Sequence, residues 1–310
     1  MKLNKIVLAC VAAVSVSAAV AGEVEVLHYW TSGGEAKSAA ELKKIMSAKG
    51  NTWKDFAVAG GGGDNAMTVL KSRVVSGNPP SAAQIKGPAI QEWAQEGVLA
   101  NLDSVAKTEK WDSVLPQVVA NVMKYKGSYV AAPVNVHRVN WVWANPDVLK
   151  KSGVASMPTN YDEFFVAAEK IKKAGFIAVA HGGQNWQDFT TFESVVLGVG
   201  GAKFYQDALV KLDPKALNSA TMKKSLETFR KIKGYTDAAS PGRDWNLATA
   251  MVMQGKAGFQ FMGDWAKGEF VAAGKKPGKD FLCAAAPGTA TSFTFNVDSF
   301  AMFKLKDAGA

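Results

Sequence analysis

The chain of 310 residues is poor in cysteine and histidine, with two of the former and three of the latter. Cys10 lies in an apolar leader, so the chain that follows keeps one cysteine, Cys283, which excludes an internal disulfide framework. The histidines, His28, His137 and His181, lie far apart without the spacing of a metal-binding motif, and we expect each to act as a hydrogen-bonding group. Packing must therefore stabilise this fold, and the sequence predicts no metal site.

Familiar catalytic and nucleotide-binding motifs are missing as well. The sequence has no Gly-x-Ser-x-Gly elbow of a serine hydrolase. The glycine run 60–63 continues into Asp64 and Asn65, without the Lys-Ser/Thr pair of a phosphate-binding loop or the later acidic residue of a dinucleotide site. We interpret the run as a turn or as the lining of a pocket, and we expect no cofactor.

Positive charge is in slight excess but is not concentrated. Without residues 1–21 the chain has 34 basic and 27 acidic residues, a net charge of +7. The lysines are spread over helix-like segments such as 43–44, 150–151 and 170–173, without the clustered arginines and interleaved aromatics of a nucleic-acid groove. We therefore expect a solvated surface and no nucleic-acid partner.

Residues 1–21 have the pattern of a secretory signal peptide. Two lysines precede a mostly apolar run over 6–20, and small residues suited to cleavage end it. A membrane anchor is the alternative, but the run is short for a span of about 20 residues. Glu23 and Glu25 follow it directly. The sequence therefore predicts export and removal of the leader, and with it of Cys10.

Strand-like and helix-like segments alternate in the first third of the chain. The expected strands are residues 24–30, 56–59 and 82–86, and the expected helices are residues 35–48, 66–76 and 90–97. This β-α-β-α order predicts a parallel α/β sheet.

A long extended stretch over residues 128–143 interrupts this alternation and predicts a crossing to a second lobe, with a hinge near 133–138. The second lobe is expected to contain helices over 145–151, 159–173, 188–198, 221–233 and 245–254, and strands over 176–180, 257–262 and 281–286. The chain returns near 287–289 and ends in a strand over 293–303. We assign 1–21 to the signal peptide, 22–134 and 289–310 to lobe 1, and 135–288 to lobe 2.

An aromatic pair next to a carboxylate ends the first strand. Tyr29 and Trp30 run into the turn 31–34, and Glu35 then begins a helix. A sugar ring has C–H faces that suit aromatic stacking and a rim of hydroxyls that suits carboxylates, so this pairing is typical of a sugar site. The alternative is a core indole beside a glutamate that the helix dipole favours.

The second lobe contains two further pairs of this kind, Asp244-Trp245 and Asp264-Trp265. They are either the opposite wall of a sugar site or turn and cap aspartates beside core indoles. Asp298 is polar inside an apolar strand, where it faces either a cleft or the solvent side of an edge. Spacing alone leaves these alternatives open.

Several motifs together resemble the extracellular solute-binding proteins of ATP-binding-cassette sugar importers, and among them the glucose/mannose-binding subgroup. The resemblance runs from about residue 23 to the end and rests on Tyr-Trp-Thr-Ser-Gly-Gly-Glu at 29–35, Gln-Ile-Lys-Gly at 84–87, Pro-Val-Asn-Val-His-Arg at 133–138, Asn-Pro-Asp-Val-Leu at 145–149 and Phe-Met-Gly-Asp-Trp at 261–265. It implies the type II periplasmic binding protein fold, in which two α/β lobes joined by hinge-crossing strands close on one sugar.

The resemblance also implies roles for particular residues. On lobe 1, Trp30 and Glu35 would contact the sugar with Lys86 beside them, and Tyr29 replaces the tryptophan expected there. The other residues that it implies are His137, Asn185, Trp245, Asp264, Trp265 and Asp298. Relatives continue well beyond the position of Phe303, so we expect that the C-terminal part of the protein is missing from this sequence.

The resemblance predicts a monomeric periplasmic protein that is not an enzyme. It would capture a monosaccharide, glucose first and mannose or galactose as alternatives, and deliver it to the membrane permease of an importer. A secreted glycosidase that uses Glu35 with Asp264 or Asp298 is a second hypothesis, since that reaction needs two carboxylates. A binding protein for a peptide or a polyamine is a third.

Overall fold

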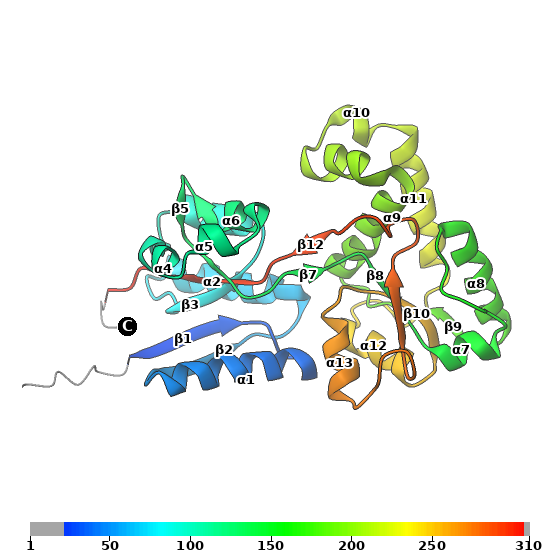
Figure 1. Ribbon diagram of the computed structural model, residues 1–310, viewed down its shortest axis with the longest axis horizontal. Coiled ribbons are helices and arrows are strands. Elements are labelled where there is room, and N and C mark those ends of the chain that lie inside the picture. The colour runs from blue at the N-terminus through cyan, green and yellow to red at the C-terminus, as the bar shows by residue number, and fades with distance from the viewer. Residues whose placement is uncertain (1–21, 307–310) are drawn as a thin grey trace, which may run out of the picture.

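A computed structural model describes residues 22–306, arranged as two α/β lobes side by side with chain segments crossing between them (Figure 1). The predicted signal peptide and Cys10 lie outside the described residues. Among residues 22–306, no helix has both the length and the apolar character needed to cross a lipid bilayer.

The sheet of lobe 1 has five strands in the order β2-β1-β3-β13-β6. β1 pairs in parallel with β2 and β3, whereas β13 is antiparallel to β3 and β6. The strands are β1 (Glu23–His28), β2 (Thr52–Ala57), β3 (Ala82–Ile85), β6 (Ala132–Pro133) and β13 (Ser299–Met302). The predicted parallel arrangement is confirmed for β1, β2 and β3.

Helices surround this sheet, and three of them match the predicted helices closely: α1 (Gly33–Ala48), α2 (Asp64–Val75) and α3 (Ala89–Gln95). The other elements of lobe 1 are η1 (Gly61–Gly63), α4 (Asp103–Thr108), α5 (Trp111–Val114), α6 (Gln117–Met123), β4 (Lys124–Tyr125) and β5 (Ser128–Tyr129). The prediction for β2 began four residues late. β2 is an edge strand whose Lys54 and Asp55 are exposed, so it lacks the apolar run that marks a central strand.

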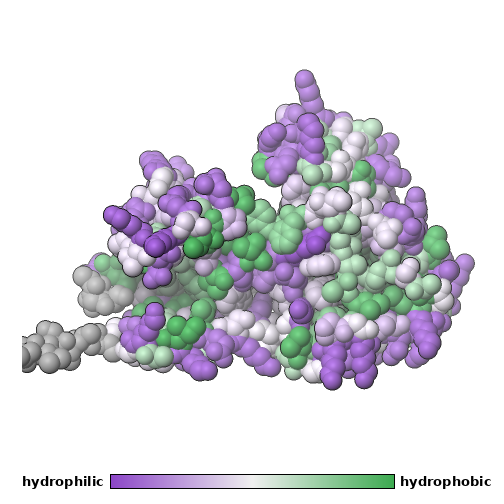
Figure 2. Space-filling view, in the orientation of Figure 1, coloured by the Kyte–Doolittle hydropathy of each residue, from purple (hydrophilic) through white to green (hydrophobic). Residues whose placement is uncertain are grey.

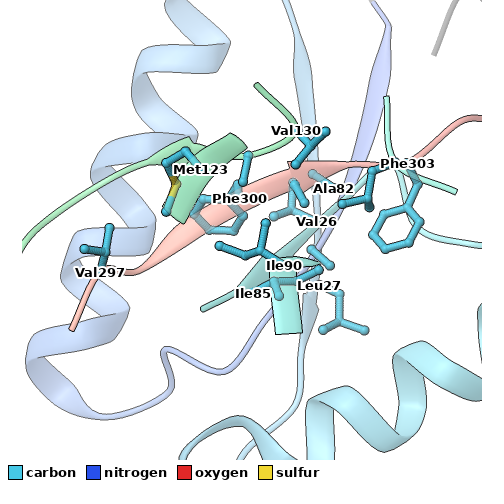
Figure 3. Packing of buried hydrophobic residues seen from close by; sticks show 14 of the residues in the cluster. Val26, Leu27, Ala82, Ile85, Ile90, Met123, Val130, Val297, Phe300 and Phe303 are labelled. Atoms are coloured by element: carbon cyan, nitrogen blue, oxygen red, sulfur yellow. The ribbon is translucent and has the colours of Figure 1, made fainter. Parts of the chain in front are cut away.

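The core of lobe 1 joins both ends of the chain. Figure 3 shows Phe300 of β13 among side chains that include Val26 of β1, Ile85 of β3 and Met123 of α6. Because β13 lies between β3 and β6, this sheet forms only after the chain has returned from lobe 2.

Lobe 2 is built on a four-stranded sheet in the order β11-β8-β10-β9. Its strands are β8 (Trp141–Ala144), β9 (Ile177–Val179), β10 (Ala257–Phe261) and β11 (Leu282–Ala285). Its helical elements are α7 (Pro146–Lys151), α8 (Tyr161–Lys173), α9 (Asn185–Tyr205), η2 (Gln206–Val210), α10 (Pro214–Leu217), α11 (Ala220–Lys233), α12 (Trp245–Met253) and α13 (Ala266–Ala272). Asn145 and Asn160 cap α7 and α8 by accepting hydrogen bonds from backbone N–H groups of the first turn, which confirms the predicted helix starts.

The predicted extended stretch over 128–143 is extended and crosses between the lobes, and the structure divides it into four short strands. These are β5 and β6 in lobe 1, β7 (His137–Arg138) between the lobes, and β8 in lobe 2. β7 pairs with β12 (Phe295–Asn296) of the returning chain, so two antiparallel segments connect the lobes (Figure 1). The final strand predicted over 293–303 is divided in the same way, because the chain has to leave one sheet before it joins the next.

Asn140 fixes the two crossing segments to each other just inside lobe 2. Its side chain is fully buried, and its amide nitrogen donates to Thr289 Oγ1 at 2.9 Å and to the Ser292 carbonyl at 3.1 Å. Its oxygen accepts from the Thr294 backbone N–H at 3.1 Å. One amide therefore satisfies polar groups at three positions of the returning chain.

Replacing Asn140 by alanine should leave these buried groups without partners. We expect Asn140→Ala to lower the free energy of unfolding by about 2–4 kcal/mol, because an unsatisfied buried donor or acceptor costs about 1–3 kcal/mol. Urea-induced unfolding measures the change. Asn218 is exposed and donates to the Pro214 carbonyl, so Asn218→Ala is the control and should change stability by less than about 0.5 kcal/mol. Equal stability of the two variants would contradict the role of Asn140.

Candidate functional site in the interlobe cleft

A cleft of about 1110 Å³ lies between the lobes, where the molecular surface is hollowed in Figure 2. Residues from both lobes and from the crossing segments line it. Nine of the ten predicted site residues are among them: Tyr29, Trp30, Glu35, Lys86, His137, Trp245, Asp264, Trp265 and Asp298. The structure thus brings together residues that are up to 269 positions apart in the chain. Their role in binding stays a prediction, whereas their shared location is a finding.

Glu35 caps α1 and also lines the cleft. Ser32 is the N-cap, and the two residues form a capping box in which Glu35 Oε2 accepts from the Ser32 backbone N–H at 3.2 Å. Burial raises the pKa of Glu35, against the hydrogen bonds from Ser32, which lower it. The sequence left open whether Glu35 is a glutamate favoured by the helix dipole or a carboxylate of the site, and the structure places it both at the helix start and in the lining of the cleft.

Tyr29 and Trp30 lie mainly in the core of lobe 1. Trp30 is only 5% exposed and packs edge to face against Phe300, with 6.0 Å between ring centroids. The hydroxyl of Tyr29, which distinguishes this chain from the expected tryptophan, lies 3.3 Å from Asp298 Oδ1 and donates to it. Burial raises the pKa of Tyr29 well above its usual value, so this hydroxyl keeps its proton. Only a small part of each ring reaches the cleft.

Asp298 organises the wall near the crossing segments. It is 4% exposed, and its Oδ1 accepts from Tyr29 and from Gln84 Nε2 at 3.2 Å. Its Oδ2 accepts from Asn135 Nδ2 at 3.3 Å and lies 3.2 Å from His137 Nε2. Both oxygens are therefore engaged within the protein. The structure favours a positioning role over the direct hydroxyl contact that the resemblance implied.

His137 bridges two carboxylates at the crossing. Its Nδ1 lies 2.6 Å from Asp264 Oδ1, while its Nε2 faces Asp298. Burial alone would lower the pKa of His137, but the hydrogen bonds and charges of the two aspartates raise it to about 9. The ring is therefore an imidazolium at neutral pH, because only that form donates from both nitrogens. Despite burial, this cation holds the pKa of Asp298 below its ordinary value.

Aromatic rings of lobe 2 form the opposite wall. Trp265 is half-buried and lies edge to face against His137, with ring centroids 5.4 Å apart. Its ring also lies over Gly263, where any side chain would overlap it. Trp186 lies 6.3 Å from Trp265, also half-buried. Trp245 is only 8% exposed, so its ring belongs mainly to the core of lobe 2.

Sequence reasoning missed Trp186 and Glu193, which line the cleft from α9, and named Asn185 instead. Asn185 is exposed at the start of α9 and does not line the cleft. Trp186 follows a Gly-Gly turn and polar residues, the same signal that identified Trp265. Glu193 gave no signal, because its partner, the Tyr205 hydroxyl at 2.7 Å, lies twelve residues later. Burial raises the pKa of Glu193 to about 7.

Lys86 holds the glycine run 60–63 in place. Its Nζ donates to the Gly62 carbonyl at 2.8 Å and lies 5.2 Å from the centre of the Tyr29 ring. Burial lowers the pKa of Lys86, while nearby carboxylates including Asp298 raise it. The backbone of Gly62 is left-handed, with φ +59°, and its φ suits glycine. The run is both the turn and the cleft lining that its sequence suggested.

The other two histidines are buried and lie near carboxylates. His181 Nε2 lies 2.6 Å from Asp188 Oδ1, and His28 Nε2 lies 3.5 Å from Asp55 Oδ1. Over residues 22–306, no group of three or more His, Cys, Asp or Glu side chains is arranged to hold a metal ion.

Comparison with known proteins decides the family. Residues 33–304 match the family of bacterial extracellular solute-binding proteins. The chain belongs to this family. A probable sugar-binding periplasmic protein of Brucella melitensis is 53% identical over 284 residues, which are 92% of this chain and 67% of that protein.

Solved structures agree with this fold. A bacterial solute receptor with a preference for β-D-galactopyranose aligns with a TM-score of 0.76 at 19% identity, covering 93% of this chain and 74% of the receptor. A chitin oligosaccharide binding protein aligns with a TM-score of 0.77, also at 19% identity and with the same coverage. The predicted two-lobed fold is confirmed.

The charge on His137 makes stability depend on pH. A raised pKa contributes stability that is complete below about 6.5, the ordinary value for histidine, and is lost as pH rises through about 9. We expect wild type to exceed His137→Gln in unfolding free energy by on the order of 3 kcal/mol at pH 6, and by much less at pH 10. Urea unfolding across this range measures the difference.

His181 provides a control, because its pKa is shifted in the opposite direction from that of His137. Burial lowers the pKa of His181, so its titration affects stability below about pH 6.5. The difference between wild type and His181→Gln should therefore stay constant from pH 7 to 10. A difference for His137→Gln that is equally constant would show that His137 is neutral in the folded protein.

Proposed function

We propose that this chain is a periplasmic sugar-binding protein, which captures a monosaccharide between its lobes and delivers it to the membrane permease of an ATP-binding-cassette importer. One observation carries the proposal. Half-buried indole rings of Trp186 and Trp265 on lobe 2 share a cleft with the fixed polar groups of Glu35 and Lys86 on lobe 1. This arrangement matches the apolar faces and the hydroxyl rim of a pyranose.

The family and its relatives support a sugar as the solute. The Brucella melitensis protein is named for sugar binding and for the periplasm, which agrees with the predicted signal peptide. The two solved structures take different sugars, a galactopyranose and chitin oligosaccharides. Within the sugars, we propose glucose as the first candidate, with mannose and galactose next.

Capture proceeds by closure of the lobes about the crossing segments β7 and β12. A sugar that contacts both walls favours the closed arrangement by the contacts that only this arrangement supplies. Water leaves the cleft, and the closed protein is the form that docks on the permease. No covalent step is involved.

The glycosidase hypothesis fits this geometry less well. A glycosidase needs one carboxyl group that donates a proton to the leaving oxygen. The second carboxylate must act as a nucleophile or a base, but both oxygens of Asp264 and of Asp298, the proposed partners of Glu35, are already engaged within the protein. Turnover of chromogenic glycosides is the measurement that would favour the enzyme, and binding of amines without sugars would favour a polyamine receptor.

Two substitutions test the cleft by calorimetric titration against glucose, mannose, galactose, disaccharides and polyamines. Trp265→Ala should weaken binding of the preferred sugar by about 1–3 kcal/mol, through a lost stacking surface. Glu35→Gln should weaken it by about 1–2 kcal/mol, because a charged acceptor becomes neutral. Glutamine still serves in a capping box, so α1 keeps its N-terminal hydrogen bonds.

Trp93 offers a matched control for the loss of an indole. It packs edge to face against Phe303 in lobe 1 and does not line the cleft. Trp93→Ala should lower the melting temperature and leave the Kd of the sugar within about twofold of the wild-type value. Sugar affinities unchanged in both Trp265→Ala and Glu35→Gln would refute the assignment of the site.

A further inference from the structure

The two lobes touch directly outside the crossing segments, at the start of α1. Figure 1 shows α1 of lobe 1 next to α13 of lobe 2, below the crossing strands. The backbone N–H of Gly34 donates to Glu269 Oε1 at 2.6 Å. A side chain of lobe 2 thus binds the N-terminus of a helix of lobe 1.

The N-terminus of α1 is capped from both lobes. Within lobe 1, Ser32 and Glu35 satisfy each other through the capping box. The Gly34 N–H, between them in sequence, takes its acceptor from Glu269 instead. The free N–H groups and the dipole of a helix start favour a carboxylate, so this contact supplies lobe closure with a charge-assisted hydrogen bond.

The contact requires glycine at position 34. A Cβ on Gly34 would lie 2.8 Å from the Gly268 carbonyl carbon and 2.9 Å from its Cα, closer than unbonded carbon atoms approach. Those atoms belong to the backbone of α13, which cannot move aside without moving the helix. A Cβ on Gly33 would lie 3.5 Å from the nearest atom, Glu269 Oε2, which is an ordinary contact. Two adjacent glycines therefore differ sharply in what they allow.

We infer that Glu269 and Gly34 form a closure contact, which holds the lobes in the arrangement that places Glu35 opposite the rings of lobe 2. Glu269 is a positioning residue in this role, because it does not line the cleft while Gly34 and Glu35 do. The charge of Glu269 also contributes to the raised pKa of Glu35, after burial and the nearer groups. The inference rests on the proposed function only where sugar affinity is the readout.

The test compares Gly34→Ala with Gly33→Ala, using small-angle scattering for the separation of the lobes and calorimetry for the preferred sugar. We expect Gly34→Ala to bind about tenfold or more weakly and to keep a larger radius of gyration at saturating sugar. Gly33→Ala should match wild type within about twofold. Alanine is the better helix former, so Gly34→Ala should not melt earlier than wild type, which separates a closure defect from misfolding.

Two variants of Glu269 test the hydrogen bond itself. Glu269→Ala should resemble Gly34→Ala in affinity and scattering, whereas Glu269→Gln keeps an acceptor and should lie between Glu269→Ala and wild type. Wild-type affinity and compaction in Gly34→Ala would overturn the inference. If wild type bound no sugar of the panel, the proposed function would fail separately. The scattering comparison of Gly34→Ala with Gly33→Ala would then decide the inference alone, with equal profiles overturning it.

Discussion

The imidazolium ring of His137 lies at the crossing between the lobes and links a carboxylate of each lobe. His137 of β7 faces Asp264 of lobe 2 through one nitrogen and Asp298 of lobe 1 through the other. Asp298 in turn accepts from Tyr29, which directly follows β1, and from Gln84 of β3. The position of the crossing is therefore tied to both sheets by charge-assisted hydrogen bonds, which are stronger and more directional than apolar contacts.

Several cleft residues also stabilise the fold, and this explains how the site is held in place. Glu35 caps α1, Lys86 fixes the Gly62 carbonyl, and Trp30 packs in the core of lobe 1. A polar group that already makes one bond to the protein has little freedom left, so it binds a ligand with a small loss of entropy. For Glu35 and Trp30, the sequence left open a structural role or a place in the cleft, and the structure shows that one residue can have both.

The sequence predicted local features well and long-range ones poorly. The strand, turn and helix at the start of lobe 1 follow from a short apolar run, a glycine turn and helical spacing, and nine of the ten predicted residues line the cleft. The engagement of both oxygens of Asp298 had no local signal, because Tyr29 lies 269 residues away. Glu269 was missed for the same reason, since its acceptor role appears only when α13 meets α1. The stretch 128–143 was correctly predicted to be extended and to cross to the second lobe, whereas its division among sheets had no local signal.

If the cleft holds a sugar, the hydrogen bonds that Asp298 makes within the protein determine which groups of lobe 1 are left to bind the sugar hydroxyls. The Tyr29 hydroxyl uses its only donor on Asp298, whose two oxygens are both engaged, so Asp298 has no oxygen left for a ligand hydroxyl and Tyr29 keeps only an acceptor. Lys86 Nζ, which has three donors, uses one on Gly62, and the hydrogen bonds of the described residues engage only Oε2 of Glu35. A donor and an acceptor thus remain at fixed positions. An epimer with one inverted hydroxyl would leave either the Lys86 donor or the Glu35 acceptor buried without a partner, at a cost of about 1–3 kcal/mol. Discrimination between epimers would then come from residues that the fold holds in place.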